Sequence, residues 1–166
     1  MKLETLEYIS PKEWEYLTQW RETVFPIEGK EIQWSPSTHH VIARDNDQKP
    51  VGHIGYGHFV VQSGSYSFSI IGVGGVVVRP EYQGQGVPKR LFEQLHKNTP
   101  SSDCLRLYTL FCPARLECYY KKHGYQKYTG LVKILQMNQL VTTDFSFMFR
   151  GDTIFGSELN LTSNPW

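Results

Sequence analysis

The sequence predicts an α+β protein that folds as a single domain over residues 1–166. The composition, with 40% hydrophobic and 20% charged residues, is that of a globular protein, and a chain of this length buries roughly 70% of its unfolded surface. Segments with a period of two residues, typical of strands, alternate with segments at helical spacing. No internal repeat or linker-like stretch divides the chain, so one domain is expected.

The N-terminal segment predicts a strand followed by a helix. Residues 2–8 alternate sufficiently to form a first strand. The run Ser10-Pro11-Lys12-Glu13 has the pattern of a capping box with proline in the first turn, ahead of apolar residues at helical spacing: Trp14, Leu17 and Val24. A helix is therefore expected to begin at about residue 11.

A loop and a hairpin are expected next. Residues 26–36 contain glycine and proline, and their apolar side chains either pack as a plain loop, which we prefer, or line an acceptor cleft. The turn-rich residues 45–50 separate two predicted strands, at 40–44 and 51–62, which is the pattern of a β-hairpin.

A strand over residues 65–78 is the centre of interest. Its first residues alternate, and it then becomes continuously apolar, as a strand that enters a covered core does. Gly72, Gly74 and Gly75 weaken this strand. They therefore predict a bulge or a close approach of another part of the backbone.

The second half of the chain predicts two helices and further strands. Val87, Leu91 and Leu95 recur every four residues and predict a helix. Residues 105–111 predict a strand, and Pro113 opens another helix that Gly124 is well placed to end: this is the usual asymmetry of proline and glycine at helix ends. Residues 125–150 predict two or three more strands.

The turn between the central strand and the helix after it is a natural anion site. N–H groups at the start of a helix have no partner inside the helix, and the helix dipole adds positive partial charge there. A P-loop requires the pattern G-x-x-x-x-G-K-[ST], which this sequence lacks. A dinucleotide fingerprint starting at Gly84 requires a third glycine where Lys89 stands.

The pattern that remains resembles the signature of the GNAT N-acetyltransferase superfamily. The run Gln83-Gly84-Gln85-Gly86-Val87-Pro88 is similar to the family's Q/R-x-x-G-x-G/A motif. Residues 114–125 are similar to its A-x-x-x-x-(F/Y)-Y-x-x-x-G-(F/Y) segment, in the expected order, and the resemblance covers about residues 40–128. It implies the GNAT fold, with a mixed, mostly antiparallel sheet flanked by helices, and acetyl-CoA-dependent N-acetyl transfer to a primary amine of a small molecule.

The resemblance also implies the residues of an acyl-CoA site. Splayed strands in this family leave backbone groups free for the pantetheine arm and the thioester carbonyl, a role that falls at about Val76 and Val78. Tyr120 stands where the family has the tyrosine that protonates the CoA thiolate, and a phenol, with a reference pKa of about 10, is protonated at neutral pH. A tyrosine that only packs is the alternative. The expected pyrophosphate-binding residues are Gln83, Gly84, Gln85, Gly86, Val87 and Lys89.

Two features depart from the family pattern. Pro88 stands where glycine or alanine is usual, and its missing N–H removes one donor to the pyrophosphate. Residues 70–78 contain no acid, although many relatives carry a glutamate or aspartate there as the base. We choose His58 as the catalytic base; His53, Glu117, a water chain and the C-terminal carboxylate are the alternatives.

The acceptor is less defined than the cosubstrate. Several short runs resemble the aminoglycoside 2′-N-acetyltransferase branch, in which a terminal tryptophan carboxylate lines the acceptor site, and Trp166 stands last here. A frayed tail is the alternative for Trp166. An aminoglycoside-like amino sugar is therefore one candidate acceptor. A non-catalytic acyl-CoA-binding or sensing module on the same fold is the alternative function.

The remaining observations exclude several other classes. The formal net charge is +1, so neither nucleic acid nor a membrane is expected as a partner. Three cysteines without disulfide spacing, and no secretory signal, indicate a cytoplasmic protein. His39 and His40 point to opposite sides of a strand, so we interpret them as surface or hydrogen-bonded histidines and expect no metal. A homodimer, common in this superfamily, is left open.

Overall fold

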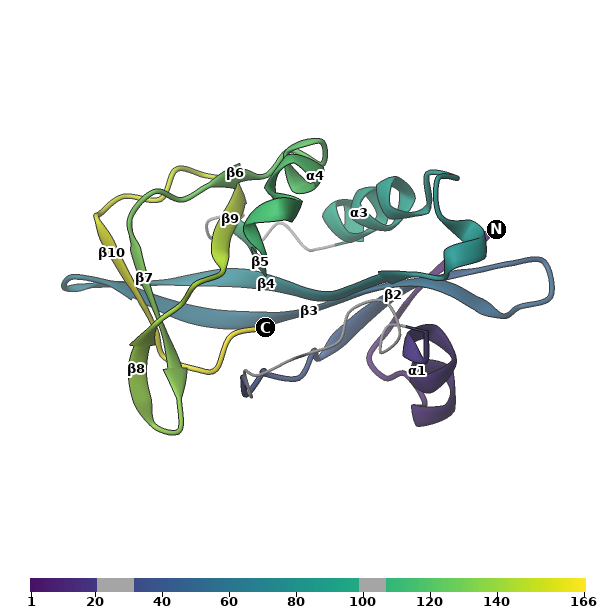
Figure 1. The fold of residues 1–166 in the computed structure, drawn as a ribbon, viewed down its shortest axis with the longest axis horizontal. Helices are drawn as coiled ribbons and strands as arrows, with labels where there is room; N and C mark the ends of the chain where they lie inside the picture. The colour runs from purple at the N-terminus through teal and green to yellow at the C-terminus, as the bar shows by residue number, and fades with distance from the viewer. Residues whose placement is uncertain (21–31, 99–106) are drawn as a thin grey trace. The chain divides into compact units, whose positions relative to one another are not determined.

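The structure, a computed structural model, describes residues 1–20, 32–98 and 107–166 (Figure 1). Strands and helices alternate along the chain, and the strands pair mostly antiparallel with two parallel pairings, so the predicted α+β class is confirmed. Val24, residues 26–31 of the expected loop, and the start of the strand expected at 105 lie outside the described residues. The contacts group the chain into two compact units, which are described in turn.

Unit 1 consists of Met1–Glu31, Ser37–Tyr56 and Gly75–Pro100. Its strands β1, β2 and the first part of β3 form an antiparallel ladder, with Ile42 of β2 opposite both Glu4 and His53. The hairpin predicted around residues 45–50 is therefore confirmed. The elements of this unit are β1 (Lys2–Leu6), α1 (Pro11–Thr18), β2 (His39–Arg44), β3 (Pro50–Ser63), the end of β4 (Tyr66–Val78), the 3-10 turn η1 (Pro80–Tyr82) and α3 (Val87–Asn98).

Helix α1 begins where the capping box predicts. The Ser10 hydroxyl accepts a hydrogen bond from the Glu13 N–H at 3.3 Å, and the Glu13 carboxylate accepts one from the Ser10 N–H at 3.3 Å. Arg44 of β2 donates to Glu13 at 2.7 Å and to Glu4 of β1 at 3.0 Å, so this guanidinium joins the helix to two strands. The first turn of α1 is thereby held against the edge of the sheet.

Helix α3 buries the apolar stripe that its sequence predicts. Val87, Leu91 and Leu95 have no solvent exposure. A Cβ built on Gly52 of β3 would lie 2.8 Å from Val87 and 3.1 Å from Leu91, so α3 packs closely on the face of β3 that carries Gly52. Because successive strand residues face opposite sides, His53 faces away from α3.

Unit 2 consists of Ile32–Pro36, Gly57–Gly74 and Ser101–Trp166. The helix after Pro113 starts later than predicted, because Pro113 precedes a 3-10 turn and α4 begins only at Glu117. Four strands occur in residues 125–150, where two or three were expected. The elements are β5 (Leu107–Cys112), η2 (Ala114–Leu116), α4 (Glu117–Lys121), β6 (Gln126–Lys127), β7 (Leu131–Gln136), β8 (Gln139–Thr142), β9 (Ser146–Gly151) and β10 (Glu158–Leu161), with the remaining parts of β3 and β4.

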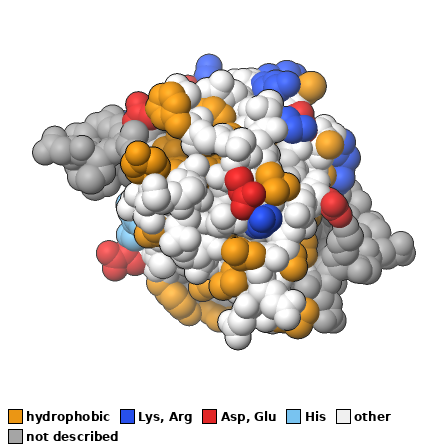
Figure 2. Space-filling view, turned by 90° about the vertical axis from the view of Figure 1, so that its left-hand side faces the viewer, with side chains coloured by type: hydrophobic (Ala, Val, Ile, Leu, Met, Phe, Trp, Pro, Cys, Tyr) orange, Lys and Arg blue, Asp and Glu red, His pale blue; other side chains and the backbone are white. Residues whose placement is uncertain are grey.

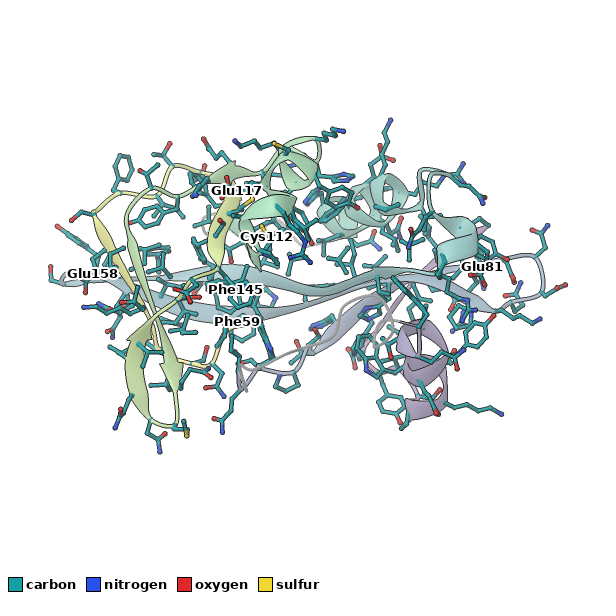
Figure 3. The ribbon with its side chains drawn as sticks, viewed as in Figure 1. Phe59, Glu81, Cys112, Glu117, Phe145 and Glu158 are labelled. Atoms are coloured by element: carbon teal, nitrogen blue, oxygen red, sulfur yellow. The ribbon has the colours of Figure 1, made fainter. Side chains whose placement is uncertain are left out.

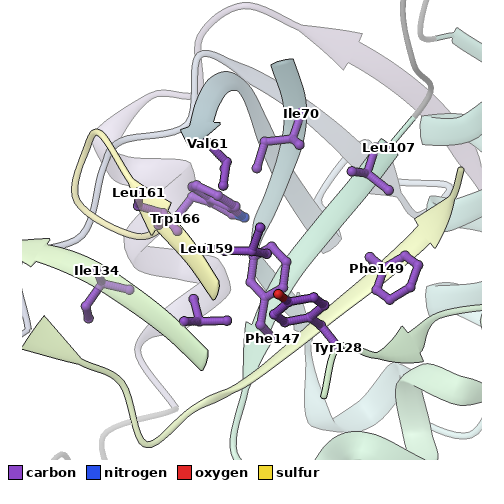
Figure 4. Close-up of a cluster of buried hydrophobic side chains, with 11 residues drawn as sticks. Val61, Ile70, Leu107, Tyr128, Ile134, Phe147, Phe149, Leu159, Leu161 and Trp166 are labelled. Atoms are coloured by element: carbon purple, nitrogen blue, oxygen red, sulfur yellow. The ribbon is translucent and has the colours of Figure 1, made fainter. Parts of the chain in front are cut away.

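Trp166 is the centre of the apolar core of unit 2 (Figure 4). Its indole N–H donates to the Thr109 carbonyl oxygen at 3.1 Å, and its ring stacks on Phe59 with centroids 4.4 Å apart. A Cβ on Gly72 would lie 2.3 Å from the indole, and one on Gly74 would lie 2.8 Å from the Trp166 carbonyl carbon. The close approach predicted at these two glycines is therefore made by Trp166, whose side chain is buried rather than frayed.

Some large hydrophobic side chains of unit 2 remain exposed. On the β7–β8 hairpin these are Met137, Leu140 and Val141. Figure 2 shows hydrophobic side chains at several places on the face it presents, separated by polar and charged groups. Among the residues described, no helix is both long and apolar enough to cross a membrane.

Replacing Gly72 by alanine is expected to destabilise the fold by about 1 to 3 kcal/mol, because the added methyl group overlaps the Trp166 ring. For a protein of this size the melting temperature should fall by about 2 to 4 °C for each kcal/mol. A double-mutant cycle with Trp166→Ala is the control, since removing the indole removes the overlap. An equal loss from Gly72→Ala with and without the indole would contradict this packing account.

Candidate functional site

The last part of β4 contains Gly75, whose φ of +58° is left-handed. A glycine in this conformation within a strand is typical of a β-bulge, because a residue with a Cβ is strained there. A side chain at this position would also lie 3.3 Å from the His53 ring and 3.4 Å from Trp14. The backbone conformation of Gly75 is therefore the one that the bulge predicted for the glycine-rich strand would require.

After Gly75, one hydrogen bond shows to which side of β4 the backbone groups of each residue point. The Arg79 N–H donates to the Val51 carbonyl oxygen of β3 at 3.0 Å, so Arg79 faces β3. Backbone groups of successive residues point to alternate sides of a strand. Val78 and Val76 therefore direct their N–H and C=O groups away from β3. The Val78 carbonyl oxygen accepts a hydrogen bond from Gln83 Nε2 at 3.1 Å.

The turn between β4 and α3 is exposed and glycine-dependent. Gly84 and Gly86 have φ values of +75° and +74°, and residues 83–86 are all exposed. The first backbone bond of α3 runs from the Arg90 N–H to the Gly86 carbonyl oxygen at 3.3 Å. The amides of Val87 and Lys89 belong to the first turn of the helix, where N–H groups have no partner within the helix.

The two glutamines of the signature stabilise this turn. Gln83 Nε2 donates back to the carbonyl oxygen of Val78, and Gln85 Nε2 donates to the carbonyl oxygen of Glu81 at 2.8 Å. Both side-chain amides thus satisfy backbone acceptors near the turn. Their structural contribution is to hold the backbone of the turn in place. The amides of the turn, rather than the glutamine side chains, are then the groups suited to an anion.

The charged side chains near the turn are mostly paired at the surface. Lys89 and Glu93 lie 4.0 Å apart and both are largely exposed, which makes a weak pair. Arg79 binds Glu81 at 2.7 Å, and its guanidinium lies 4.1 Å from the centre of the Tyr16 ring of α1. Figure 3 labels Glu81 beside this turn. Because the pair between Lys89 and Glu93 is weak, the Lys89 ammonium group is available to attract an anion bound at the start of α3.

Among the described residues of unit 1, His53 is the most buried ionisable side chain, with 1% exposure. Its Nδ1 lies 2.7 Å from the Gly75 carbonyl oxygen, and its Nε2 lies 2.9 Å from His40 Nδ1. Trp14 of α1 packs edge-on against the ring, with centroids 5.0 Å apart. Burial lowers the pKa of His53 to about 4, and burial together with His39 lowers the pKa of His40.

Tyr120 lies in unit 2, on α4. Its side chain is 8% exposed, and its ring has edge-to-face contacts with Tyr119 and Tyr125, at centroid distances of 5.1 and 6.2 Å. Its carbonyl oxygen accepts the N–H groups of His123 and Tyr125, and Gly124 ends the helix with a φ of +84° as predicted. These contacts fix the orientation of the ring.

Glu117 is the first residue of α4 and Cys112 is the last residue of β5, both in unit 2, and Figure 3 labels both. Lys127 donates to the Glu117 carboxylate at 2.7 Å, and this hydrogen bond is the main reason that the pKa of Glu117 is lowered. A carboxylate held ionised in this way is a weak base. Burial raises the pKa of the Cys112 thiol to about 11, so this cysteine is a poor nucleophile at neutral pH.

His58 lies in unit 2, on the exposed side of β3. It lines an open surface pocket of about 240 Å³ together with Phe59, Val60, Ser69, Thr162 and Ser163. The described part of the loop expected to line an acceptor cleft, residues 32–36, packs in the same unit. Trp34 contacts Phe145 edge-to-face at 5.7 Å, and the Ser35 N–H donates to the Pro165 carbonyl oxygen. The plain-loop interpretation fits these contacts.

A match to a protein-family model covers residues 36–127, more than half of the chain, and the family is described as the acetyltransferase (GNAT) domain. The chain belongs to the GNAT acetyltransferase family. This assignment makes it an N-acetyltransferase, and it confirms the family to which both sequence motifs pointed. The GNAT fold explains the order of the β4 strand, the signature turn and α3 in this acetyltransferase.

Solved structures show the same fold at low identity. An aminoglycoside 6′-N-acetyltransferase complexed with coenzyme A is 15% identical, with a TM-score of 0.59, covering 91% of this chain and 97% of that chain. YhbS from Escherichia coli, a GNAT family N-acetyltransferase in complex with CoA, is 13% identical, with a TM-score of 0.59 and coverages of 96% and 88%. A GNAT family acetyltransferase from Staphylococcus aureus is 15% identical, with a TM-score of 0.60 and coverages of 90% and 99%. A comparison with curated proteins finds no significant match.

The histidine pair formed by His40 and His53 was missed by sequence reasoning. Adjacent histidines gave no useful spacing, because the partner of His40 lies on the next strand. The register places His40 opposite Gly55 and His53 opposite Ile42, so the two rings are diagonal neighbours. The signal in the sequence for this pair was the predicted hairpin itself, whose register places Gly55 opposite His40. In the described part of the chain, no group of three side chains is arranged to hold a metal.

The buried His53 predicts a specific loss of stability in acid. A histidine in the unfolded chain titrates near pH 6.5, whereas His53 in the fold stays neutral down to about pH 4. As the pH falls through this window, the unfolded chain takes up a proton that the folded chain does not, so the free energy of unfolding decreases. Between pH 7.5 and pH 4.5 the contribution of His53 should be about 2 to 3 kcal/mol.

Urea unfolding of the unmodified protein and of His53→Gln at these two pH values measures this contribution. The difference in stability between the two pH values should be smaller in His53→Gln by that amount, because glutamine does not titrate. Identical pH dependence in both proteins would show that His53 does not have the lowered pKa.

Proposed function

We propose that this GNAT acetyltransferase transfers an acetyl group from acetyl-CoA to a primary amine of a small molecule. The observation that carries the proposal is the exposed turn between β4 and α3, with two left-handed glycines and the amides of the first helical turn. Its sequence resembles the family signature except at Pro88, and two of the similar structures were solved with CoA bound.

The pyrophosphate of the cosubstrate is assigned to this turn. Amides of Gly84, Gln85, Gly86, Val87 and Lys89 are the proposed donors. The start of α3 adds the positive end of its dipole, which favours an anion. Gln83 contributes by holding the turn through its bond to Val78. Pro88 supplies no N–H, so this enzyme has one donor fewer than the family signature provides.

The strand after Gly75 is assigned to the pantetheine arm and the thioester. Val76 and Val78 direct their backbone groups away from β3, which is the orientation needed for hydrogen bonds to a bound chain. The Val78 carbonyl oxygen already accepts from Gln83, so the N–H of Val78 is the group proposed for the cosubstrate. Among the described residues of unit 2, the parallel pairing of β4 with β5 is found at Ile71 and Gly72, although β5 continues to Cys112. Strands that splay apart lose the hydrogen bonds between them, so a β4–β5 pairing that ends early is what splayed strands would produce.

The transfer step needs a nucleophile, a proton acceptor and a proton donor. The amine nitrogen attacks the thioester carbonyl carbon, the C–N bond forms, and the C–S bond breaks as the thiolate leaves. Tyr120 is the proposed donor of a proton to that thiolate. The buried position and fixed ring of this phenol support the role. The base expected from the sequence, His58, is exposed and lines a surface pocket, and no other contact among the residues described supports it in that role.

The proposed acceptor class is the amino sugars. The sequence similarity is with aminoglycoside 2′-N-acetyltransferases, whereas the aminoglycoside enzyme among the similar structures acts at the 6′ position. The two similarities agree on an amino sugar and differ on the position of its amine. We therefore propose the class and leave the position to experiment.

Pro88→Ala tests the assignment of the turn. The substitution restores an N–H at the start of α3, and a hydrogen bond to a charged group is worth about 1.5 to 3 kcal/mol. Because alanine also loses the rigidity of proline, we expect CoA to bind about 3- to 10-fold more tightly by isothermal titration calorimetry. Pro11→Ala is the matched control, since Pro11 occupies the first turn of α1. Unchanged affinity in Pro88→Ala, or an equal gain in Pro11→Ala, would contradict the assignment.

Release of free CoA from acetyl-CoA in the presence of a panel of primary amines tests the reaction itself. The panel should contain aminoglycosides, polyamines and aromatic amines. We expect turnover with at least one amino sugar. Binding of CoA without turnover across the whole panel would favour the acyl-CoA-binding module instead.

Tyr120→Phe tests the proposed acid. Removing the phenol proton should lower the single-turnover rate about 100-fold, while the Kd of CoA stays within about twofold. Tyr119→Phe is the control, because Tyr119 neighbours Tyr120 on the same helix and contacts its ring. Tyr120 would be a packing residue if both variants kept the rate of the unmodified enzyme.

A further inference from the structure

Helix α4, which carries Tyr120, has only five residues, Glu117–Lys121. A helix this short is not stable by itself, because its first turn fixes several residues for very few hydrogen bonds. Its N-cap residue, Leu116, makes no side-chain cap hydrogen bond. The position of Tyr120 therefore depends on how the rest of unit 2 holds α4.

Helix α4 lies in the connection between two strands that pair with opposite edges of β9. β5 pairs with one edge, where Cys112 stands opposite Ser146, and β6 pairs with the other, where Lys127 stands opposite Met148. Paired residues share a face of the sheet, and so do alternate residues of one strand. Ser146, Met148 and Arg150 of β9 therefore point to one side together with Cys112 and Lys127.

The Glu117 carboxylate binds the start of α4 to this face of the sheet. The Ser146 hydroxyl donates to Glu117 Oε1 at 2.5 Å, and Lys127 Nζ donates to the same oxygen at 2.7 Å. Ser146 is buried and the Glu117 side chain is 16% exposed, so little water competes for the bond between them. One carboxylate thus joins the first residue of α4 to both β9 and β6.

Arg150 of β9 holds the opposite end of α4. Its Nη1 donates to the His123 carbonyl oxygen at 3.0 Å, and a Cβ built on Gly124 would lie 3.5 Å from the guanidinium. Arg150 and Ser146 are four residues apart on the same face of β9. This strand therefore supports α4 at both ends, and Tyr120 lies between the two supports.

Glu117 and Tyr120 are three residues apart, so they lie on the same side of α4. Tyr120 is 8% exposed, and its ring meets the edges or faces of Tyr119 and Tyr125. A rotation or tilt of so short a helix moves the carboxylate and the phenol together. The hydrogen bonds of Glu117 therefore restrict the orientation of the Tyr120 ring.

We propose that Glu117 is a positioning residue for the acetyl transfer: its hydrogen bonds to Ser146 and Lys127 fix α4 and thereby aim the Tyr120 phenol. The inference rests on the proposed function, in which Tyr120 gives a proton to the CoA thiolate. Glu117 was one of the alternatives for the catalytic base. Its Oε1 instead accepts two hydrogen bonds from the elements that support α4.

Glu158 of β10 is a matched control for Glu117 in the same unit. Its carboxylate accepts from Lys133 at 2.9 Å and from Asn160 at 3.1 Å, so it also binds one ammonium group and one neutral side chain. β10 pairs with β3 and β7, whereas the bonds of Glu117 go to β9 and β6. Figure 3 labels both carboxylates. Glu158→Ala thus removes a similar carboxylate without touching the support of α4.

Carbon NMR of ring-labelled tyrosine measures the orientation of Tyr120 without any substrate. The Tyr120 signals are those that disappear in Tyr120→Phe. Glu117→Ala should shift these signals, because the ring loses its fixed contacts with Tyr119 and Tyr125, whereas Glu158→Ala should leave them in place. Unchanged Tyr120 signals in Glu117→Ala would overturn the proposal, whatever the activity assays show.

Single-turnover kinetics with an amine acetylated by the unmodified enzyme tests the effect on the reaction. Glu117→Ala should lower the rate about 10-fold, because a displaced catalytic group works poorly, while the Kd of CoA stays within about twofold. Glu117→Gln should recover most of the rate, since its amide oxygen still accepts from Ser146 and Lys127. Glu158→Ala should keep the full rate.

A double-mutant cycle with Tyr120→Phe separates positioning from a general structural role. Once the phenol proton is absent, Glu117→Ala should lower the rate less than about twofold further, because residues that act as a unit are not additive. An equal loss with and without the phenol would overturn the proposal, as would a similar loss in Glu158→Ala.

Ser146→Ala keeps the proposal testable if Glu117→Ala does not fold, because it removes one bond and leaves the Lys127 pair. We expect shifted Tyr120 signals and a rate about threefold lower, and an unchanged rate with unchanged signals would overturn the proposal. An unchanged rate in Tyr120→Phe would contradict the proposed acid instead, and the ring signals would still report whether Glu117 holds Tyr120.

Discussion

The hydrogen bond between His53 and the Gly75 carbonyl group is the interaction on which unit 1 depends. It exists because glycine alone adopts the left-handed conformation found at Gly75 without strain, and because no side chain at Gly75 obstructs the imidazole. Gly75 sets the alternation of the strand that follows, so Val76 and Val78 turn their backbone groups away from β3. The same strand then leads into the glycine turn and α3. Gly75 thus lies at the point where the histidine pair meets the strand that leads to the proposed thioester and anion sites.

The three glycines of β4 are each required for a different physical reason. Gly75 is required by its own backbone conformation and by His53. Gly72 and Gly74 are required by Trp166, which lies against them in unit 2 and buries its indole among Phe59, Phe111 and Phe147. Residues 70–78 of this strand contain no acid, and the carbonyl oxygen of Gly75 lies within hydrogen-bond distance of the His53 ring of β3.

The sequence was sufficient for the elements whose signals are local. The capping box located α1, the spacing of Val87, Leu91 and Leu95 located α3, and the two motifs identified the family. It was insufficient where the structure depends on contacts between distant residues. Trp166 against Gly72, and His40 against His53, arise from strand register and from packing, which periodicity does not specify. The late start of α4 has a local cause: Pro113 fits the residue before a 3-10 turn as well as the first turn of a helix.

The central claim is that the backbone amides after Gly75 of β4 bind the diphosphate of CoA. A proton–nitrogen backbone spectrum recorded during titration with CoA measures those amides directly. The account predicts large downfield shifts for the amide protons of Gly84, Gly86, Val87 and Lys89, and smaller ones for Val76 and Val78. Saturable CoA binding that leaves these amides unchanged and shifts others would contradict it.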